Sequence, residues 1–347
     1  MKHAMSTRSK VVITGMGWVT PLGHSLEAAW QKMLAGESGV STTTRFDAAA
    51  FPTRFSAEVK NYRLDIDASG YKHRAAIAPR TEFLLGAAAQ AWRHAQLHDS
   101  AVAVAPDRVG VYLANGEGAL DFESFARTCL EAWDAERGTL DTVRWARAAL
   151  RNLDAARELE QEPSTALAHV ATLTGARGPA FNTITACAAS AQAIGEASEL
   201  LRRGDADVMI AGGASSMIHL FGVTGFNRLT TLSTRNDAPQ AASRPFDASR
   251  DGFVIGEGAG VVVLEALEHA TARRAPILVE LAGYGSSADA YRITDQHPES
   301  FGCIDAMRRA LKSAGVQPEQ VDYVNAHGTG TRENDPHETE ALHAVFG

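Results

Sequence analysis

Apolar residues along the chain alternate between short β-branched runs and longer stretches with helical spacing. Residues 11–15 form an apolar run that predicts a first strand, and Ser25 is expected to cap an amphipathic helix that ends at Leu34. Further strands are predicted over residues 108–114, 181–185, 206–211 and 261–265, and further helices over residues 81–97, 188–201 and 267–274. This alternation is typical of an α/β protein.

The order of elements at the start of the chain recurs near its end. The elements predicted after Pro276 are a strand over residues 277–285, a helix over residues 301–314 and a strand over residues 321–326. We therefore predict two homologous halves, over residues 1–275 and 276–347. The second half has no counterpart of the later strands of the first, so we expect the C-terminal half to be truncated.

Residues 119–163 differ in character from the rest of the first half. Arg, Glu, Trp and Ala recur at helical spacing over residues 122–133 and again over residues 143–159. We predict that this region is a helical cap inserted into the N-terminal half.

Composition indicates an ordinary globular protein and limits its partners. The chain has 347 residues, of which 45% are hydrophobic and 21% are charged, and its formal net charge is -8. This excess of acidic residues argues against nucleic-acid binding, because phosphate contacts require a clustered positive surface. Lys72, Arg74 and Arg80 form a local basic cluster against this acidic background.

The cysteines and the distribution of apolar residues indicate the compartment. Cys129, Cys187 and Cys303 are too few and too scattered for a disulfide framework, and no paired spacing suggests a zinc site. The N-terminus lacks the apolar segment of a secretory signal, and no apolar stretch is long enough to span a membrane. We therefore expect a cytoplasmic protein that binds neither a membrane nor a metal ion.

The strand predicted before Cys187 ends close to that residue, and a helix rich in small residues follows. Unpaired N–H groups and the helix dipole favour a thiolate at such a corner, which makes Cys187 a candidate nucleophile. A buried structural cysteine is the alternative that this local pattern leaves open. His327 also follows a predicted strand and is a candidate partner of Cys187, although a histidine beside glycines equally fits a structural loop.

Five segments of the chain carry a resemblance to a known family. They are residues 185–187 (TAC), 233–237 (STRND), 241–247 (AASRPFD), 251–260 (DGFVIGEGAG) and 325–331 (NAHGTGT). In this order they resemble the β-ketoacyl-acyl-carrier-protein synthases of the condensing-enzyme family, and the resemblance covers almost the whole chain. Residues 332–340 look more like ketosynthases of type II polyketide or aryl-polyene pathways than like enzymes of housekeeping fatty-acid synthesis.

This resemblance implies a thiolase-like fold and a defined reaction. The fold consists of two βαβαβαββ halves packed as five α/β layers, and no cofactor is implied. Cys187 would take an acyl chain from an acyl carrier protein. A malonyl-loaded carrier would then lose carbon dioxide and attack this acyl-enzyme in a decarboxylative Claisen condensation. His327 would stabilise the developing negative charge, and Asp335 and Glu338 would support that histidine.

The resemblance also implies a substrate pocket and partners. Glu117 stands where the family usually places an apolar residue of the acyl pocket. Docking of an acidic carrier protein requires a basic surface, for which Lys72, Arg74 and Arg80 are the candidates. A homodimer, or a heterodimer with a ketosynthase-like paralogue, is expected. The family's second catalytic histidine would follow Gly347.

Two other functions remain open from the sequence. The first is a non-catalytic partner subunit that pairs with an active ketosynthase and sets chain length. Because such partners usually lack the nucleophile, Cys187 favours an enzyme. The second is a thiolase or a simple acyltransferase, and the motif at residues 327–331 favours the decarboxylating branch instead.

Overall fold

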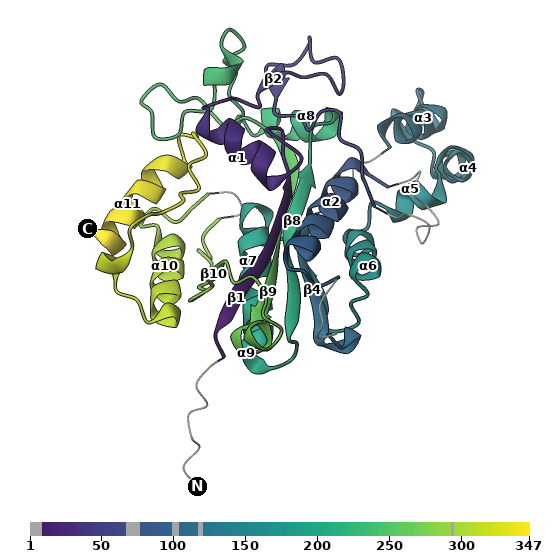
Figure 1. Cartoon of the computed structure of the whole chain (residues 1–347). Helices are drawn as coiled ribbons and strands as arrows, with labels where there is room; N and C mark the ends of the chain where they lie inside the picture. Colours follow the sequence, from purple (N-terminus) through teal and green to yellow (C-terminus); the bar gives the residue numbers. More distant parts are fainter. Residues whose placement is uncertain (1–8, 67–76, 99–103, 117–120, 293–294) are drawn as a thin grey trace.

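A six-stranded mixed sheet lies at the centre of the molecule (Figure 1). The structure is a computed structural model and describes residues 9–66, 77–98, 104–116, 121–292 and 295–347. In spatial order the strands are β10 (Val279–Glu280), β1 (Val11–Val19), β9 (Glu257–Ala266), β8 (Val208–Ser216), β4 (Val109–Asn115) and β7 (Ala180–Thr183).

The strands of this sheet pair in two ways. β4 runs parallel to β7 and β8, and Val111 of β4 is aligned with Ala180 and Ile210. β9 runs antiparallel to β1 and to β8. β4 and β8 are buried on both faces of the sheet, which explains why the sequence of each is a nearly continuous apolar run. β1 and β8 are longer than the sequence predicts and end at Val19 and Ser216.

Helices cover both faces of the sheet. The helices of the main body are α1 (Leu26–Leu34), α2 (Pro79–His94), α6 (Pro163–Thr174), α7 (Ala189–Arg203), α8 (Leu220–Arg228) and α9 (Leu267–Ala272). α2 and α6 cover one face, where Leu84 and Val170 pack in one buried cluster with Val263 of β9. On the other face, Leu201 of α7 packs with Leu264, the next residue of β9. Because neighbouring side chains of a strand point to opposite faces, β9 contributes to both clusters.

The N-terminal elements follow the predicted local signals. The Ser25 hydroxyl accepts a hydrogen bond from the N–H of Ala28 at 3.3 Å and caps α1 as expected. Residues 40–66 carry two short strands, β2 (Ser41–Thr42) and β3 (Phe55–Ser56), which pair with each other. No helix in the described part of the chain is long and apolar enough to cross a membrane.

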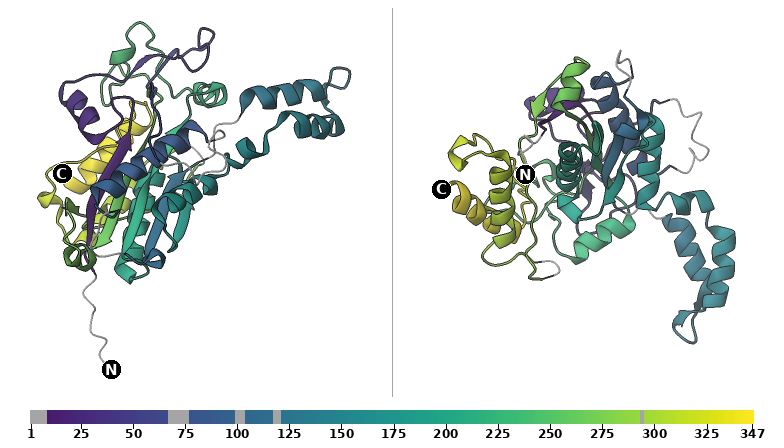
Figure 2. Two further views of the ribbon diagram at one scale, coloured as in Figure 1. Left: turned by 45° about the vertical axis from the view of Figure 1, so that its right-hand side comes forward. Right: turned by 90° about the horizontal axis from the view of Figure 1, so that it is seen from below.

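The region for which the sequence predicts a helical cap projects from the body as an arm (Figures 1 and 2). Its elements are α3 (Phe122–Ala132), β5 (Trp133–Asp134), β6 (Thr139–Leu140), α4 (Thr142–Asn152) and α5 (Ala155–Leu159). The carboxylates of Asp121, Asp141 and Asp154 accept hydrogen bonds from first-turn N–H groups and begin the three helices. α3 and α4 pack on each other and leave Leu150 89% exposed at the surface of the arm.

The C-terminal region departs from the predicted strands. α10 (Phe301–Ala314) and α11 (Asn334–Phe346) pack on each other beside the sheet. Of the strand predicted over residues 277–285, only Val279–Glu280 pairs with β1, and residues 321–326 form no strand. A strand requires a neighbouring strand to which it is hydrogen-bonded. Tyr323 is 78% exposed, and the apolar pattern of residues 321–326 alone was not enough to produce a strand. The boundary between the two predicted halves, which was placed between residues 275 and 276, stays a prediction.

Candidate active site

Cys187 lies in the short turn that joins β7 to α7. A 3₁₀ turn spans Ala186–Ala188, and α7 begins at Ala189. Ala186 has a φ angle of 49°, a left-handed conformation that a residue with a Cβ adopts at an energetic cost. The turn leaves Cys187 exposed at the N-terminal end of α7, where the helix dipole favours a negative charge. The strand-to-helix corner predicted from the sequence is therefore present, and Cys187 is not a buried structural cysteine.

His327 meets Cys187 from a distant part of the chain. The side chains of the two residues lie close enough to interact, although 140 positions separate them in the sequence. The hydrogen bond from His327 holds the pKa of the Cys187 thiol below its ordinary value. The same contact raises the pKa of His327, and the charges of Glu338 and Asp335 raise it further. Both shifts favour a thiolate beside an imidazolium, which is the nucleophilic form of a cysteine.

Glu338 holds the main chain at His327. Its carboxylate accepts hydrogen bonds from the N–H of His327 at 2.6 Å and from the N–H of Gly328 at 2.8 Å. Glu338 lies in the second turn of α11 and is 9% exposed. Because a charged acceptor in a buried site forms strong hydrogen bonds, this contact fixes the position of the main chain from which the His327 ring projects.

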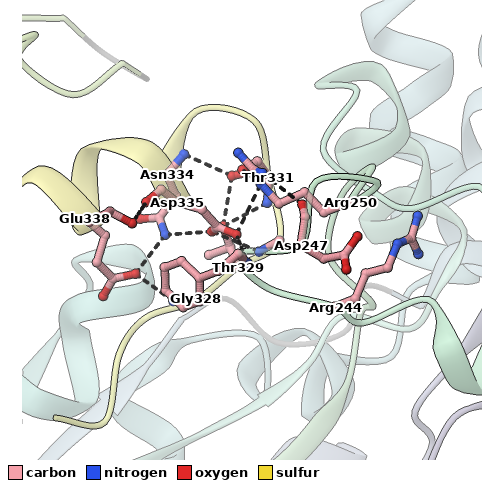
Figure 3. A network of polar contacts seen from close by, with 12 residues as sticks. Arg244, Asp247, Arg250, Gly328, Thr329, Thr331, Asn334, Asp335 and Glu338 are labelled. Atoms are coloured by element: carbon pink, nitrogen blue, oxygen red, sulfur yellow. Dashed lines mark hydrogen bonds and ion pairs between the residues drawn. The ribbon is translucent and has the colours of Figure 1, made fainter.

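Asp335 ties the same loop to a second segment of the chain. Its carboxylate accepts hydrogen bonds from the N–H of Gly330 at 3.1 Å and from the N–H of Phe246 at 2.7 Å. The Arg250 guanidinium lies 3.3 Å from Asp335, which is 2% exposed. Figure 3 shows this network of buried polar contacts between α11, the loop after His327 and the segment around Arg250. The N–H of Gly252 also donates to the carbonyl of Gly330 at 3.0 Å.

Asn334 and Arg250 are members of this network that sequence reasoning did not select. Both lie in or beside stretches that carry the family resemblance, since Arg250 directly precedes the 251–260 motif and Asn334 lies within residues 332–340. The sequence around a polar residue in a predicted loop does not show whether that residue is buried. Only the three-dimensional structure reveals the contacts of Asn334 and Arg250. Glu117, Lys72 and Arg74 lie outside the described residues.

The structure corrects the expectation that Arg80 docks a carrier protein. Arg80 is 2% exposed, and its guanidinium donates hydrogen bonds to the carbonyl of Gly116 and, at 3.4 Å, to the carbonyl of Glu160. Burial lowers its pKa to about 10, although Glu160 opposes that shift. Gly116 and Glu160 lie close to the two points where the arm leaves and rejoins the body. Arg80 therefore fastens the base of the arm and is inaccessible to a partner.

Replacing Arg80 with methionine is expected to lower the free energy of unfolding by about 3 kcal/mol, because two buried carbonyls and Glu160 lose their cationic partner. Urea unfolding measures this loss. Arg93→Met is the control, because Arg93 lies on the same helix and is exposed, and its loss is expected to be about 0.5 kcal/mol or less. If Arg80→Met left the free energy of unfolding unchanged and raised the KM for a carrier-bound substrate, Arg80 would be a docking residue as the sequence predicted.

The described part of the chain holds no group of three or more His, Cys, Asp or Glu side chains arranged to bind a metal ion. A thiolate at a strand-to-helix turn, paired with a histidine, is an arrangement that can form covalent intermediates by nucleophilic attack.

Comparison with known proteins identifies the family. The family model of the β-ketoacyl synthase N-terminal domain matches residues 8–270, and that of the C-terminal domain matches residues 278–347. The 3-oxoacyl-acyl-carrier-protein synthase 2 of Coxiella burnetii is 39% identical over 342 residues, which cover 98% of this chain and 78% of that protein. The chain therefore belongs to the β-ketoacyl synthase family.

Two solved structures are similar to the whole of this fold. A β-ketoacyl synthase from Burkholderia phymatum has a TM-score of 0.85 and 32% identity, with 98% of this chain and 78% of that chain covered. A type II polyketide ketosynthase, in complex with its acyl-carrier protein and bound to the hexaketide, has a TM-score of 0.82 and 31% identity at the same coverage. The resemblance, the thiolase-like α/β fold and the condensing-enzyme class expected from the sequence are thus confirmed.

Proposed function

We propose that the protein condenses an acyl thioester with malonyl-acyl-carrier-protein by decarboxylative Claisen condensation, giving a β-ketoacyl-acyl-carrier-protein for fatty-acid or polyketide synthesis. The observation that carries this proposal is the meeting of Cys187, exposed at the N-terminal end of α7, with His327, which supplies a nucleophile and a hydrogen-bond donor at one point. A partner subunit without catalysis has no use for such a pair.

In the first half-reaction, the Cys187 thiolate attacks the carbonyl carbon of the acyl-carrier thioester. The new C–S bond forms, the bond to the carrier sulfur breaks, and the carrier thiolate leaves with the electron pair and takes up a proton. A thiolate suits this step because it is a strong nucleophile and later a good leaving group. The N–H of Cys187, at the N-terminal end of α7, is placed to stabilise the oxyanion that forms.

In the second half-reaction, the malonyl group loses carbon dioxide. The electron pair of the broken C–C bond becomes an enolate, whose carbon attacks the acyl-enzyme and expels the Cys187 thiolate. His327 donates a hydrogen bond to the malonyl thioester oxygen, where the negative charge develops. Glu338 and Asp335 act through His327, because they hold the backbone from which its ring projects.

The proposed partners follow from this chemistry. Acyl- and malonyl-loaded carrier proteins deliver both substrates, and Lys72 and Arg74 remain the proposed docking residues because a carrier protein is acidic. Glu117 is proposed to line the acyl pocket. We also propose a dimer, with a second copy or a paralogue. β7 is an end strand of the sheet and presents Phe181, and an exposed sheet edge is ready to pair with another strand.

The proposed division into residues 1–275 and 276–347 is supported by the ranges of the two family models. The proposed compartment is the cytoplasm, because a reactive thiolate such as that of Cys187 must stay reduced between turnovers.

Intact-mass spectrometry of the purified chain tests the reaction. After incubation with an acyl-loaded carrier protein, the mass is expected to rise by one acyl group on Cys187. Addition of malonyl carrier protein is then expected to return the mass to its original value and to yield a β-ketoacyl carrier. Prior alkylation of Cys187 with iodoacetamide is expected to prevent both changes. An unmodified protein in the presence of several acyl-carrier types would contradict the proposal.

A further inference from the structure

Asn334, the first residue of α11, uses all its polar groups in the network behind His327. It is 8% exposed, and its side-chain N–H₂ group donates to Asp335 at 3.2 Å and to Glu338 at 3.1 Å. Its side-chain oxygen accepts a hydrogen bond from Gln296 at 3.2 Å. Its backbone N–H donates to the Thr331 hydroxyl at 3.1 Å.

The amide of Asn334 therefore stands between two buried carboxylates. Asp335 and Glu338 are both nearly inaccessible to water, and two negative charges close together in such a site repel each other strongly. One donor group that serves both carboxylates reduces this repulsion without adding charge. Arg250 is the cation that faces Asp335, and His327 and Cys303 are the other titratable groups near the pair.

Other side chains cannot replace this bridge. Aspartate has the same shape but offers acceptors in place of donors, which would bring a third carboxylate to the site. Alanine removes both donors and leaves two carboxylate oxygens with fewer partners. Both changes remove the donor that holds the Glu338 carboxylate in place against the N–H of His327.

We propose that Asn334 is a positioning residue, which holds Asp335 and Glu338 in the arrangement that keeps His327 against Cys187. This inference rests on the proposed function for its catalytic consequence. The contact between His327 and Cys187, however, is measurable without any carrier protein.

The test compares Asn334→Ala and Asn334→Asp with the parent protein. The rate of Cys187 alkylation by iodoacetamide is measured against pH, and its midpoint reports how far His327 stabilises the thiolate. We expect both variants to move the midpoint to higher pH and to alkylate at least about five-fold more slowly at pH 7. With carrier substrates, kcat is expected to fall while KM stays near the parent value.

Asn152→Ala is the matched control. Asn152 also donates its side-chain amide to a carboxylate, that of Glu131 at 3.3 Å, but it lies on the arm. Its alkylation profile is expected to match that of the parent. Thermal unfolding of each variant separates stability from positioning, because a purely structural role of Asn334 lowers Tm and leaves the midpoint unchanged.

The outcomes distinguish this inference from the proposed function. An unchanged midpoint in folded Asn334→Ala or Asn334→Asp overturns the positioning role, whatever the condensing activity. A raised midpoint in a protein that is never acylated by a carrier supports the positioning role and contradicts the proposed reaction. Alanine adds no charge to the site, so Asn334→Ala decides the matter where the third carboxylate of Asn334→Asp reduces stability.

Discussion

Cys187→Ser is expected to slow transfer of an acyl group from a carrier protein by about 10³-fold or more. A serine hydroxyl is far less acidic than a thiol, so the contact with His327 cannot generate an anionic nucleophile at neutral pH. Because Cys187 is exposed in a turn, the substitution is expected to leave the stability of the fold nearly unchanged. Intact-mass measurement of the acyl-enzyme over time gives the rate.

Cys303→Ser is the matched control for this substitution. Burial and the charges of Glu338 and Asp289 raise the pKa of Cys303, so its thiol stays protonated and unreactive. Acylation of Cys303→Ser is expected to proceed at close to the parent rate. Acylation of Cys187→Ser that is as fast as in the parent would show that another residue is the nucleophile.

His327→Ala is expected to reduce both half-reactions, for two separable reasons. Since the interaction with His327 lowers the pKa of Cys187, removing the imidazole raises that pKa toward the ordinary value of a thiol. At pH 7 a smaller fraction of the Cys187 side chain is then thiolate, and acylation slows accordingly. The hydrogen-bond donor to the malonyl thioester oxygen is also lost. This loss is expected to reduce the rate of condensation by a further factor of about 10².

The pH dependence separates these two effects. Because a thiolate becomes more populated as pH rises, alkylation and acylation of His327→Ala are expected to recover between about pH 7 and pH 9. Condensation is expected to stay low over the same range, since a higher pH does not restore the hydrogen-bond donor. Recovery of condensation together with acylation would show that His327 serves only to activate Cys187. An alkylation midpoint identical to that of the parent would exclude that activation.

Local signals were sufficient for much of the architecture. The hydroxyl of Ser25 begins α1 because a first-turn N–H group needs an acceptor, and that requirement is satisfied within four residues. The segment before Cys187 likewise forms a strand, which ends at Thr183 instead of the predicted residue 185, and the small residues after Cys187 form a turn and a helix. Such features depend on neighbours in the sequence and are therefore visible in it.

The errors arose where the deciding partner lies far away in the chain. Arg80 belongs to a basic cluster in the sequence, but it is buried because the carbonyls of Gly116 and Glu160 come together around it. The apolar run at residues 321–326 was expected to be a strand, but it pairs with no strand in the described part of the chain. Charge and apolar periodicity do not reveal which other segment will supply a partner.

The sequence by itself determined the α/β class, the motifs of the family and the identity of Cys187 and His327 as candidates. Only the tertiary structure decided that these two side chains meet and that Asn334, Asp335 and Glu338 form one buried network behind them. The physical reason is that pKa values and buried hydrogen bonds depend on distance in space and on exclusion of water. The fold sets both of these conditions when it brings distant segments together.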